Sequence, residues 1–172
     1  GLINRHNCVV TLVDTGLEAM TGARLRKIQQ LIGVETFMLS YGDGLSDVDL
    51  GKLVKHHQDN KKFLTVTGVR PPSRFGELQV DDTNNVTGFN EKPQASGGRI
   101  SGGFFVCEPN VFDYLEPRED LVFEKEPIQK IVHESQMTMY PHDEFWQCMD
   151  TYRDWELLNQ MFKSGKAPWV RS

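Results

Sequence analysis

Two aspartates stand where a carboxylate could take part in chemistry. Asp43 follows the apolar run 37–41 and lies between two glycines. Asp150 ends the run 146–149, directly before Thr151. In an open parallel sheet, ligands bind beyond the carboxyl ends of the strands, where two carboxylates that met could hold a hard cation such as Mg²⁺. Equally, Asp43 could shape a turn and Asp150 could be an additional helix cap.

An acidic and a basic residue precede a proline near the middle of the sequence. Glu91 and Lys92 stand directly before Pro93, a residue that ends strand pairing at a sheet edge. A lysine at this position could bind a phosphate as a point charge. The plainer interpretation is a solvated surface pair that contributes little to stability.

Two further patterns could bring the chain close to a ligand. Ser101, Gly102 and Gly103 lie inside a predicted strand, and paired glycines there mark either a bulge or the close approach of a ligand. Arg24 lies near the start of a predicted helix, where free backbone N–H groups favour anions. An arginine on a solvated helix face is the alternative interpretation.

Two adjacent histidines, His56 and His57, lie within another predicted helix. Neighbouring helix positions face different directions, so the two rings do not readily share one metal ion. We expect one of them to face the core or to be half-buried, and we assign neither a function.

The first half of the chain alternates strand and helix patterns, which is typical of a mostly parallel α/β sheet with helices on both faces. The predicted elements are a strand at 7–14, a helix at 21–33, a strand at 36–41, a helix capped by Ser46 or Asp47, and a strand at 63–69. Residues 76–80 and 86–89 predict a small antiparallel hairpin around the polar turn 81–85.

The second half continues the α/β pattern. Its predicted elements are a strand at 100–107, helices at 109–115 and 127–134, strands at 137–140 and 146–149, and a final helix that begins with a capping box at Thr151–Asp154. No linker composition interrupts the chain, so residues 1–172 are predicted to form one α/β domain.

Composition excludes several classes of function. The net charge of −5 does not provide the broad basic surface that nucleic-acid binding needs. No stretch approaches the roughly 20 apolar residues of a membrane helix. The three cysteines form no C-x-x-C pair, which argues against a disulfide framework or a zinc site and indicates a reducing, cytoplasmic protein.

Eight short strings occur in the order that is found in one enzyme family. They are Thr11–Gly16 (TLVDTG), Met20–Leu25 (MTGARL), Tyr41–Asp47 (YGDGLSD), Arg74–Gly76 (RFG), Glu91–Pro93 (EKP), Ser101–Val106 (SGGFFV), Phe145–Thr151 (FWQCMDT) and Lys166–Trp169 (KAPW). Together they resemble the glucose-1-phosphate cytidylyltransferases, a branch of the sugar-1-phosphate nucleotidyltransferase family. The resemblance covers essentially the whole chain.

The resemblance implies a Rossmann-like fold of the nucleotide-diphospho-sugar transferase type. It implies an enzyme of polysaccharide biosynthesis that joins CTP and α-D-glucose 1-phosphate into CDP-glucose, releases pyrophosphate and assembles as a homo-oligomer. Asp43 and Asp150 would bind Mg²⁺. Arg24 would lie near phosphate groups, including those of a neighbouring subunit. The residues implied around the glucosyl phosphate are Tyr41, Gly42, Glu91, Lys92, Ser101 and Gly102.

The chain departs from the family pattern in three places. The family's glycine-rich Gly-x-Gly-Thr-Arg segment does not occur, so we expect the carboxyl-terminal part of a nucleotidyltransferase that releases little pyrophosphate by itself. Ser101 stands where the family usually has Asn, and Cys148 where it usually has Pro. The alternative hypothesis is a non-catalytic fragment that binds sugar phosphate or supports oligomer assembly.

Overall fold

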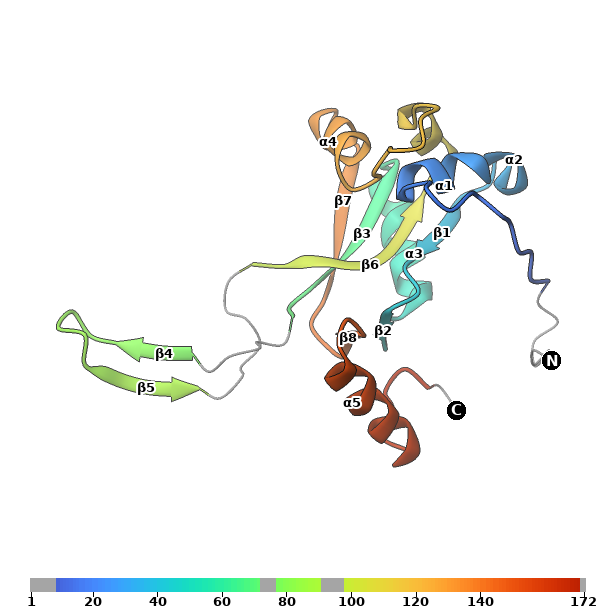
Figure 1. The fold of residues 1–172 in the computed structure, drawn as a ribbon. Coiled ribbons are helices and arrows are strands. Elements are labelled where there is room, and N and C mark those ends of the chain that lie inside the picture. Colours follow the sequence, from blue (N-terminus) through green and yellow to red (C-terminus); the bar gives the residue numbers. More distant parts are fainter. Residues whose placement is uncertain (1–8, 72–76, 91–97, 171–172) are drawn as a thin grey trace.

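The computed structural model describes residues 9–71, 77–90 and 98–170. Figure 1 shows a central sheet with helices packed around it and a separate two-stranded hairpin. In chain order the elements are α1 (Thr21–Lys27), α2 (Gln29–Ile32), β1 (Phe37–Ser40), β2 (Gly44–Ser46), α3 (Leu50–Asn60), β3 (Leu64–Val69), β4 (Glu77–Val80), β5 (Val86–Asn90), β6 (Ile100–Cys107), the 3-10 helix η1 (Pro109–Tyr114), α4 (Glu126–His133), β7 (Met137–His142), β8 (Trp146–Cys148) and α5 (Tyr152–Lys163).

The main sheet has the strand order β1-β6-β3-β7. β3 and β7 are parallel, and β6 is antiparallel to both of its neighbours, β1 and β3. Three of the four strands therefore run in the same direction, in agreement with the mostly parallel sheet that we expected. β6 reverses because a parallel neighbour of β3 would need a crossover over a sheet face. The hairpin β4–β5 intervenes between β3 and β6 instead.

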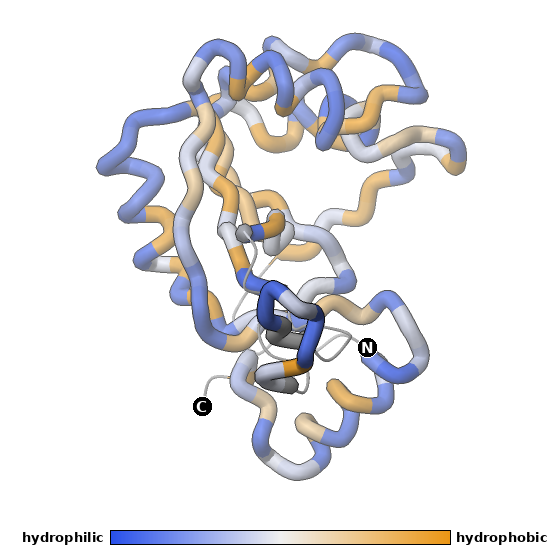
Figure 2. The backbone as a smooth tube through the Cα atoms, turned by 90° about the vertical axis from the view of Figure 1, so that its left-hand side faces the viewer, coloured by the Kyte–Doolittle hydropathy of each residue, from blue (hydrophilic) through white to orange (hydrophobic). Residues whose placement is uncertain are grey.

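Helices cover both faces of the sheet, as predicted. Leu64 and Val66 of β3 point into the main apolar core, whereas Thr65 points to α3 on the other face. Figure 2 shows hydrophobic residues concentrated along the central strands. The other buried members of the core come from η1, β6, α1, α4 and the loops beside them: Ala19, Ala23, Leu25, Phe105, Cys107, Val111, Phe112, Leu115, Leu121, Phe123 and Ile131.

A buried histidine joins α3 to the sheet. His57 is 1% exposed, and its Nδ1 lies 2.7 Å from the Thr65 hydroxyl. Its Nε2 lies 3.0 Å from Glu108 Oε1, and the same carboxylate accepts a hydrogen bond from the Thr36 hydroxyl. His56 is only half-buried, so the expectation for the histidine pair is confirmed. These contacts connect α3 with β3, with the end of β6 and with the residue before β1.

The strand that was predicted at 7–14 is wrong for the residues that the structure describes. Residues 9–14 are not a strand, and Val9 and Leu12 are more than 90% exposed. A strand needs a neighbour for its backbone groups, and no described strand pairs with this segment. β-branched residues are compatible with an extended chain, but they do not supply that partner.

Most other predicted elements are confirmed, with one helix divided in its middle and one helix capped by a different residue. The helix predicted at 21–33 is divided at Ile28 into α1 and α2. α3 is capped by Asp49, whose carboxylate accepts from Lys52 N, and not by Ser46 or Asp47. Ser46 belongs to β2, where its hydroxyl donates to a backbone carbonyl. The hairpin β4–β5 and the capping box of α5 agree with the sequence.

A small second ribbon lies beyond the main sheet and positions the candidate site. β2 pairs with β8 in antiparallel register, from Gly44 opposite Cys148 to Ser46 opposite Trp146. The buried His142 at the end of β7 secures the far end of this ribbon. Its Nε2 lies 3.1 Å from the Phe145 carbonyl oxygen and 3.0 Å from Asp47 Oδ1. The ribbon is therefore attached to the carboxyl end of β7, an edge strand of the main sheet.

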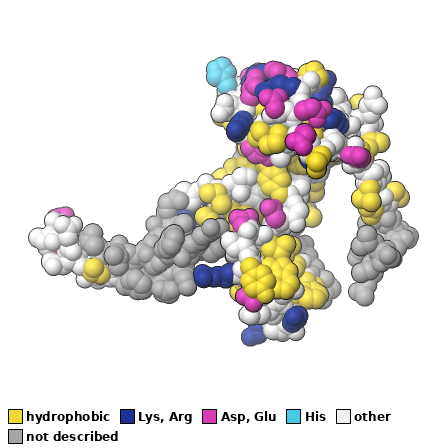
Figure 3. All heavy atoms as spheres, viewed as in Figure 1, with side chains coloured by type: hydrophobic (Ala, Val, Ile, Leu, Met, Phe, Trp, Pro, Cys, Tyr) yellow, Lys and Arg dark blue, Asp and Glu magenta, His cyan; other side chains and the backbone are white. Residues whose placement is uncertain are grey.

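The surface carries mixed charges and some exposed aromatic side chains. Figure 3 shows acidic and basic side chains side by side at the upper end of the molecule. Among the ion pairs of the described residues, Arg118 and Lys130 both pair with Glu126. Exposed pairs of this kind contribute little individually. No helix among the described residues has the length and apolar character to span a bilayer.

Replacing His57 by alanine is expected to destabilise the fold, because the buried Thr65 hydroxyl and the Glu108 carboxylate each lose a partner. We expect a loss of about 2–4 kcal/mol in the free energy of unfolding, measured by urea unfolding followed by circular dichroism. The control is His133→Ala, since His133 is exposed at the end of α4. The same small loss in both variants would contradict the role given to His57.

Candidate functional site

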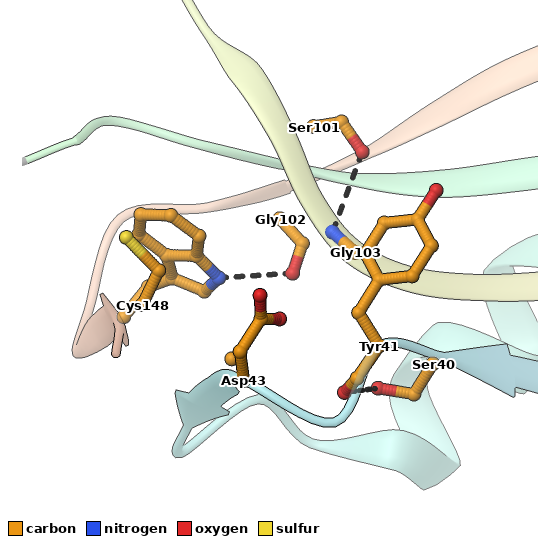
Figure 4. A pocket seen from close by; sticks show the side chains of 9 residues that line it. Ser40, Tyr41, Asp43, Ser101, Gly102, Gly103 and Cys148 are labelled. Atoms are coloured by element: carbon orange, nitrogen blue, oxygen red, sulfur yellow. Dashed lines mark hydrogen bonds between the residues drawn. The ribbon is translucent and has the colours of Figure 1, made fainter. Parts of the chain in front are cut away.

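A pocket lies where the carboxyl end of β1 meets the start of β6 and the β2–β8 ribbon (Figure 4). Because β6 is antiparallel to β1, its first residues lie at the carboxyl edge of the parallel strands, the edge at which ligands bind in open α/β sheets. The residues that line the pocket are Ser40, Tyr41, Asp43, Gly44, Ser101, Gly102, Gly103, Trp146 and Cys148.

A bulge in β6 forms one wall of the pocket. Val66 is opposite Phe105 while Gly68 is opposite Ser101, so two steps along β3 match four steps along β6. The bulge that we gave as one interpretation of the paired glycines is therefore present. A Cβ on Gly102 would lie 2.7 Å from Val69 Cγ1, and Trp146 Nε1 donates to the Gly102 carbonyl at 2.9 Å. The backbone at Gly102 is thus held between β3 and the indole.

The ring of Tyr41 forms a second wall. Gly103 has a φ of +76°, and a Cβ there would lie 2.7 Å from Tyr41 Cδ2, so the ring occupies the space that a side chain would fill. The ring also packs edge-on against Phe105, with centroids 5.8 Å apart. The Tyr41 hydroxyl donates to Glu124. Burial, and then this hydrogen bond, raise the pKa of Tyr41 far above its ordinary value, so the side chain is neutral.

The pairing of β2 with β8 brings the backbone at the two predicted aspartates to the same end of the ribbon, beside this pocket. The Met149 N–H donates to the Asp43 carbonyl oxygen at 2.8 Å, which continues the pairing of the ribbon past Gly44 and Cys148. Asp43 lines the pocket, and the Cys148 thiol, which also lines it, donates to Asp150 Oδ2 at 3.2 Å. Both aspartates are exposed. Residues 107 positions apart in the sequence (150 minus 43) are therefore neighbours in space.

These two aspartates have the donor type that Mg²⁺ prefers. No three His, Cys, Asp or Glu side chains converge as a complete metal cage within residues 9–71, 77–90 and 98–170. Mg²⁺ does not require one, because it is commonly held by one or two carboxylates together with waters and substrate phosphates. Two exposed carboxylates, Asp43 and Asp150, fit this mode of Mg²⁺ binding. They do not provide the four ligands of a closed tetrahedral zinc site.

Two further predicted residues that the structure describes, Arg24 and Gly42, are not part of the pocket lining. Arg24 does not line the pocket; its guanidinium donates to the Thr15 hydroxyl at 2.7 Å and to the Leu17 carbonyl. Gly42 is exposed between two lining residues but is not in the lining itself. Glu91 and Lys92 lie outside the described residues.

Sequence reasoning did not select Trp146 or Glu124. Trp146 could have been found, because it lies two positions before Cys148 in a strand and alternation places both side chains on one face. Glu124 gave no such signal. It lies in the loop before α4, 83 positions from Tyr41, and only the packing of that loop brings the two together.

Comparison with known proteins gives consistent relatives. A family model described as nucleotidyl transferase matches residues 19–156. The glucose-1-phosphate cytidylyltransferase of Salmonella typhi is 39% identical over 161 residues, which cover 93% of this chain and 62% of that protein. A probable glucose-1-phosphate cytidylyltransferase of Bacillus subtilis (strain 168) is 39% identical over 160 residues, with the same coverage. The chain thus spans 62% of the length of these relatives.

A solved structure supports the fold. The crystal structure of a putative glucose-1-phosphate thymidylyltransferase from Bacillus anthracis superposes with a TM-score of 0.64 at 17% identity. The match covers 90% of this chain and 63% of that one. At this level of identity the similarity concerns the fold alone.

The Gly103→Ala variant tests the contact between the bulge and the Tyr41 ring. We expect a loss of about 2–4 kcal/mol in unfolding free energy, from the positive φ and from the clash with the ring. The matched control is Gly165→Ala, where φ is +71° but no atom lies within 4 Å of the added Cβ. It should lose only about 1 kcal/mol. Equal losses in urea unfolding would show that the ring is not packed against Gly103.

Cys148 should be a slow nucleophile. Burial, and then the hydrogen bond and charge of Asp150, raise the pKa of its thiol from 9.0 to about 11. Since only the thiolate reacts, a higher pKa lowers the reactive fraction, and alkylation by iodoacetamide at pH 8 should be about 100-fold slower than for an unperturbed thiol.

Mass spectrometry in a Cys8→Ser background measures this rate for Cys148. Cys107 should remain unmodified, because it is buried and its pKa is raised to about 12. Asp150→Asn should speed the reaction, because it removes the carboxylate that favours the protonated thiol. Alkylation of Cys148 at the rate of a free thiol would refute the arrangement.

Proposed function

We propose that this chain, which belongs to the nucleotidyl transferase family, is the part of a glucose-1-phosphate cytidylyltransferase that binds the sugar phosphate and the metal ion. In the proposed reaction, a phosphate oxygen of α-D-glucose 1-phosphate attacks the α-phosphorus of CTP. The new P–O bond forms CDP-glucose, and the bond to the β-phosphate breaks to release pyrophosphate. The observation that carries the proposal is the pocket at the carboxyl edge of the sheet with Asp43 and Asp150 at its rim.

The residues of the pocket suit this chemistry. The attacking phosphate oxygen is already anionic near neutral pH, so the protein needs no general base and has mainly to align two anions. Tyr41 and Trp146 provide flat apolar walls that can pack against a sugar ring, and the bulge at Gly102 lets a ligand approach the backbone closely. Ser101, whose hydroxyl accepts from Gly103 N, lies at the edge where a sugar hydroxyl would bind.

Asp43 and Asp150 are proposed to bind Mg²⁺. The bound ion would neutralise the charge of the phosphates that meet at the rim. The protein's part would be to hold the two carboxylates close to each other, and the backbone hydrogen bond from Met149 to Asp43, which brings the two chain segments together, supports this. Lys92 and Glu91 are proposed to contact the glucosyl phosphate and the sugar, as the family resemblance implies.

We assign the binding of CTP to no residue of the pocket, because the chain spans 62% of the length of its cytidylyltransferase relatives. Arg24 is proposed to face phosphate groups, including those of a neighbouring copy. We further propose a cytoplasmic homo-oligomer in polysaccharide biosynthesis. Mass measurement of the purified chain in solution tests the assembly, and a monomer would contradict it.

Calorimetry with glucose 1-phosphate tests the proposed site. We expect the chain to bind this ligand more tightly when Mg²⁺ is present, and to bind glucose or inorganic phosphate far more weakly. Asp43→Asn and Asp150→Asn should each weaken the Mg²⁺-dependent binding by about 10-fold or more, because each removes a proposed metal ligand.

The matched control is Asp113→Asn, an exposed carboxylate on η1, which follows the opposite end of β6. It should bind as the unmodified chain does. The proposal fails if a folded sample gives no heat at millimolar glucose 1-phosphate, or if both rim variants keep the full effect of Mg²⁺.

A further inference from the structure

Glu124 lies outside the pocket lining, yet one of its carboxylate oxygens is bound by a residue of that lining and the other by the first turn of α1. Oε1 accepts from the Tyr41 hydroxyl, and Oε2 accepts from the Thr21 hydroxyl at 2.7 Å. The Thr21 oxygen in turn accepts from the Phe123 N–H at 2.9 Å. One carboxylate therefore joins three segments: the end of β1, the first turn of α1 and the loop before α4.

The Tyr41 ring needs such an anchor. Its contacts with Phe105 and with the space above Gly103 are apolar, and apolar contacts have little directional preference. A hydrogen bond to a charged acceptor is directional and stronger than one between neutral groups. The bond from the Tyr41 hydroxyl to Glu124 thus fixes the orientation of the ring about its side-chain torsions.

The same bond determines what the Tyr41 hydroxyl can do for a ligand. Its proton is directed to Glu124, so it is not free to be donated to a phosphate in the pocket. Tyr41 then acts through the face of its ring.

We propose that Glu124 is a positioning residue for the pocket, which, braced by Thr21, holds the Tyr41 ring in the orientation that a sugar phosphate contacts. The identity of the ligand as a sugar phosphate rests on the proposed function, whereas the anchoring of the Tyr41 ring does not. Loss of the anchor frees the ring to rotate into the pocket or away from it, and ligand affinity falls without any direct contact between Glu124 and the ligand.

A double-mutant cycle on the full chain separates positioning from direct contact. Glu124→Ala and Tyr41→Phe should each weaken glucose 1-phosphate binding by about 10-fold, and the double variant by no more than either single variant. Glu124→Gln retains a side-chain acceptor for the hydroxyl and should stay within about 3-fold of the unmodified chain. Additive losses in the double variant would show that the hydroxyl and the carboxylate act separately and would overturn the proposal.

The matched control is Glu119→Ala. Glu119 is an exposed acid in the segment that leads to the same loop, but it pairs with Lys27 and not with Tyr41. It should leave binding unchanged. A loss in Glu119→Ala equal to that in Glu124→Ala would show a general charge effect and would count against positioning.

A second readout needs no ligand. With ¹³C-labelled tyrosine, the ring signal of Tyr41, assigned by its absence in Tyr41→Phe, should shift and broaden in Glu124→Ala and remain unchanged in Glu119→Ala. An unchanged Tyr41 signal in Glu124→Ala overturns the proposal, whatever the chain binds. A shifted signal in a chain that binds no glucose 1-phosphate supports the anchor and refutes the proposed ligand, so the two failures are distinguishable.

Discussion

The register of β6 against β3 is the constraint on which the pocket depends. Between the Val66–Phe105 and Gly68–Ser101 pairs, β6 contains two more residues than β3. The two consecutive glycines of β6 lie in this stretch. A larger residue at Gly102 would require Val69 to shift, because its Cβ would lie 2.7 Å from Val69 Cγ1. This excess backbone lies at the carboxyl edge of the sheet, where Ser101, Gly102 and Gly103 line the pocket.

The other walls are supported from this bulge and from the ribbon beside it. Trp146 bonds the Gly102 carbonyl, so β8 is attached to β6 as well as to β2. His142 holds the opposite end of the ribbon at the end of β7. The backbone at Asp43 and Asp150 is therefore brought together by the pairing of the ribbon, and both residues are exposed beside the pocket.

The charges around the pocket explain why a cation belongs in the proposal. No Lys or Arg lines the pocket among the residues that the structure describes, whereas Asp43 lines it and Asp150 adjoins it. Arg70 and Arg99 do not line the pocket, and both form ion pairs with Asp143. A sugar phosphate that met only carboxylates would be repelled, which is why the proposed site includes a divalent ion and the positive charge of Lys92.

The sequence by itself determined what depends on neighbours along the chain. Apolar periodicity indicated α3, β3, β6 and the hairpin, and the Thr151–Asp154 spacing indicated the start of α5, because side-chain alternation and capping are local interactions. The eight motifs pointed to the family to which the chain belongs.

Only the tertiary structure decided what depends on distant partners. The run at 9–14 has strand-forming residues but no described neighbour to pair with, and the direction of β6 follows from the path through the hairpin. Glu124 binds Tyr41 because packing of the loop before α4 places it there. Hydrogen bonds between residues far apart in sequence depend on where the packed core places them, and no local pattern encodes that position.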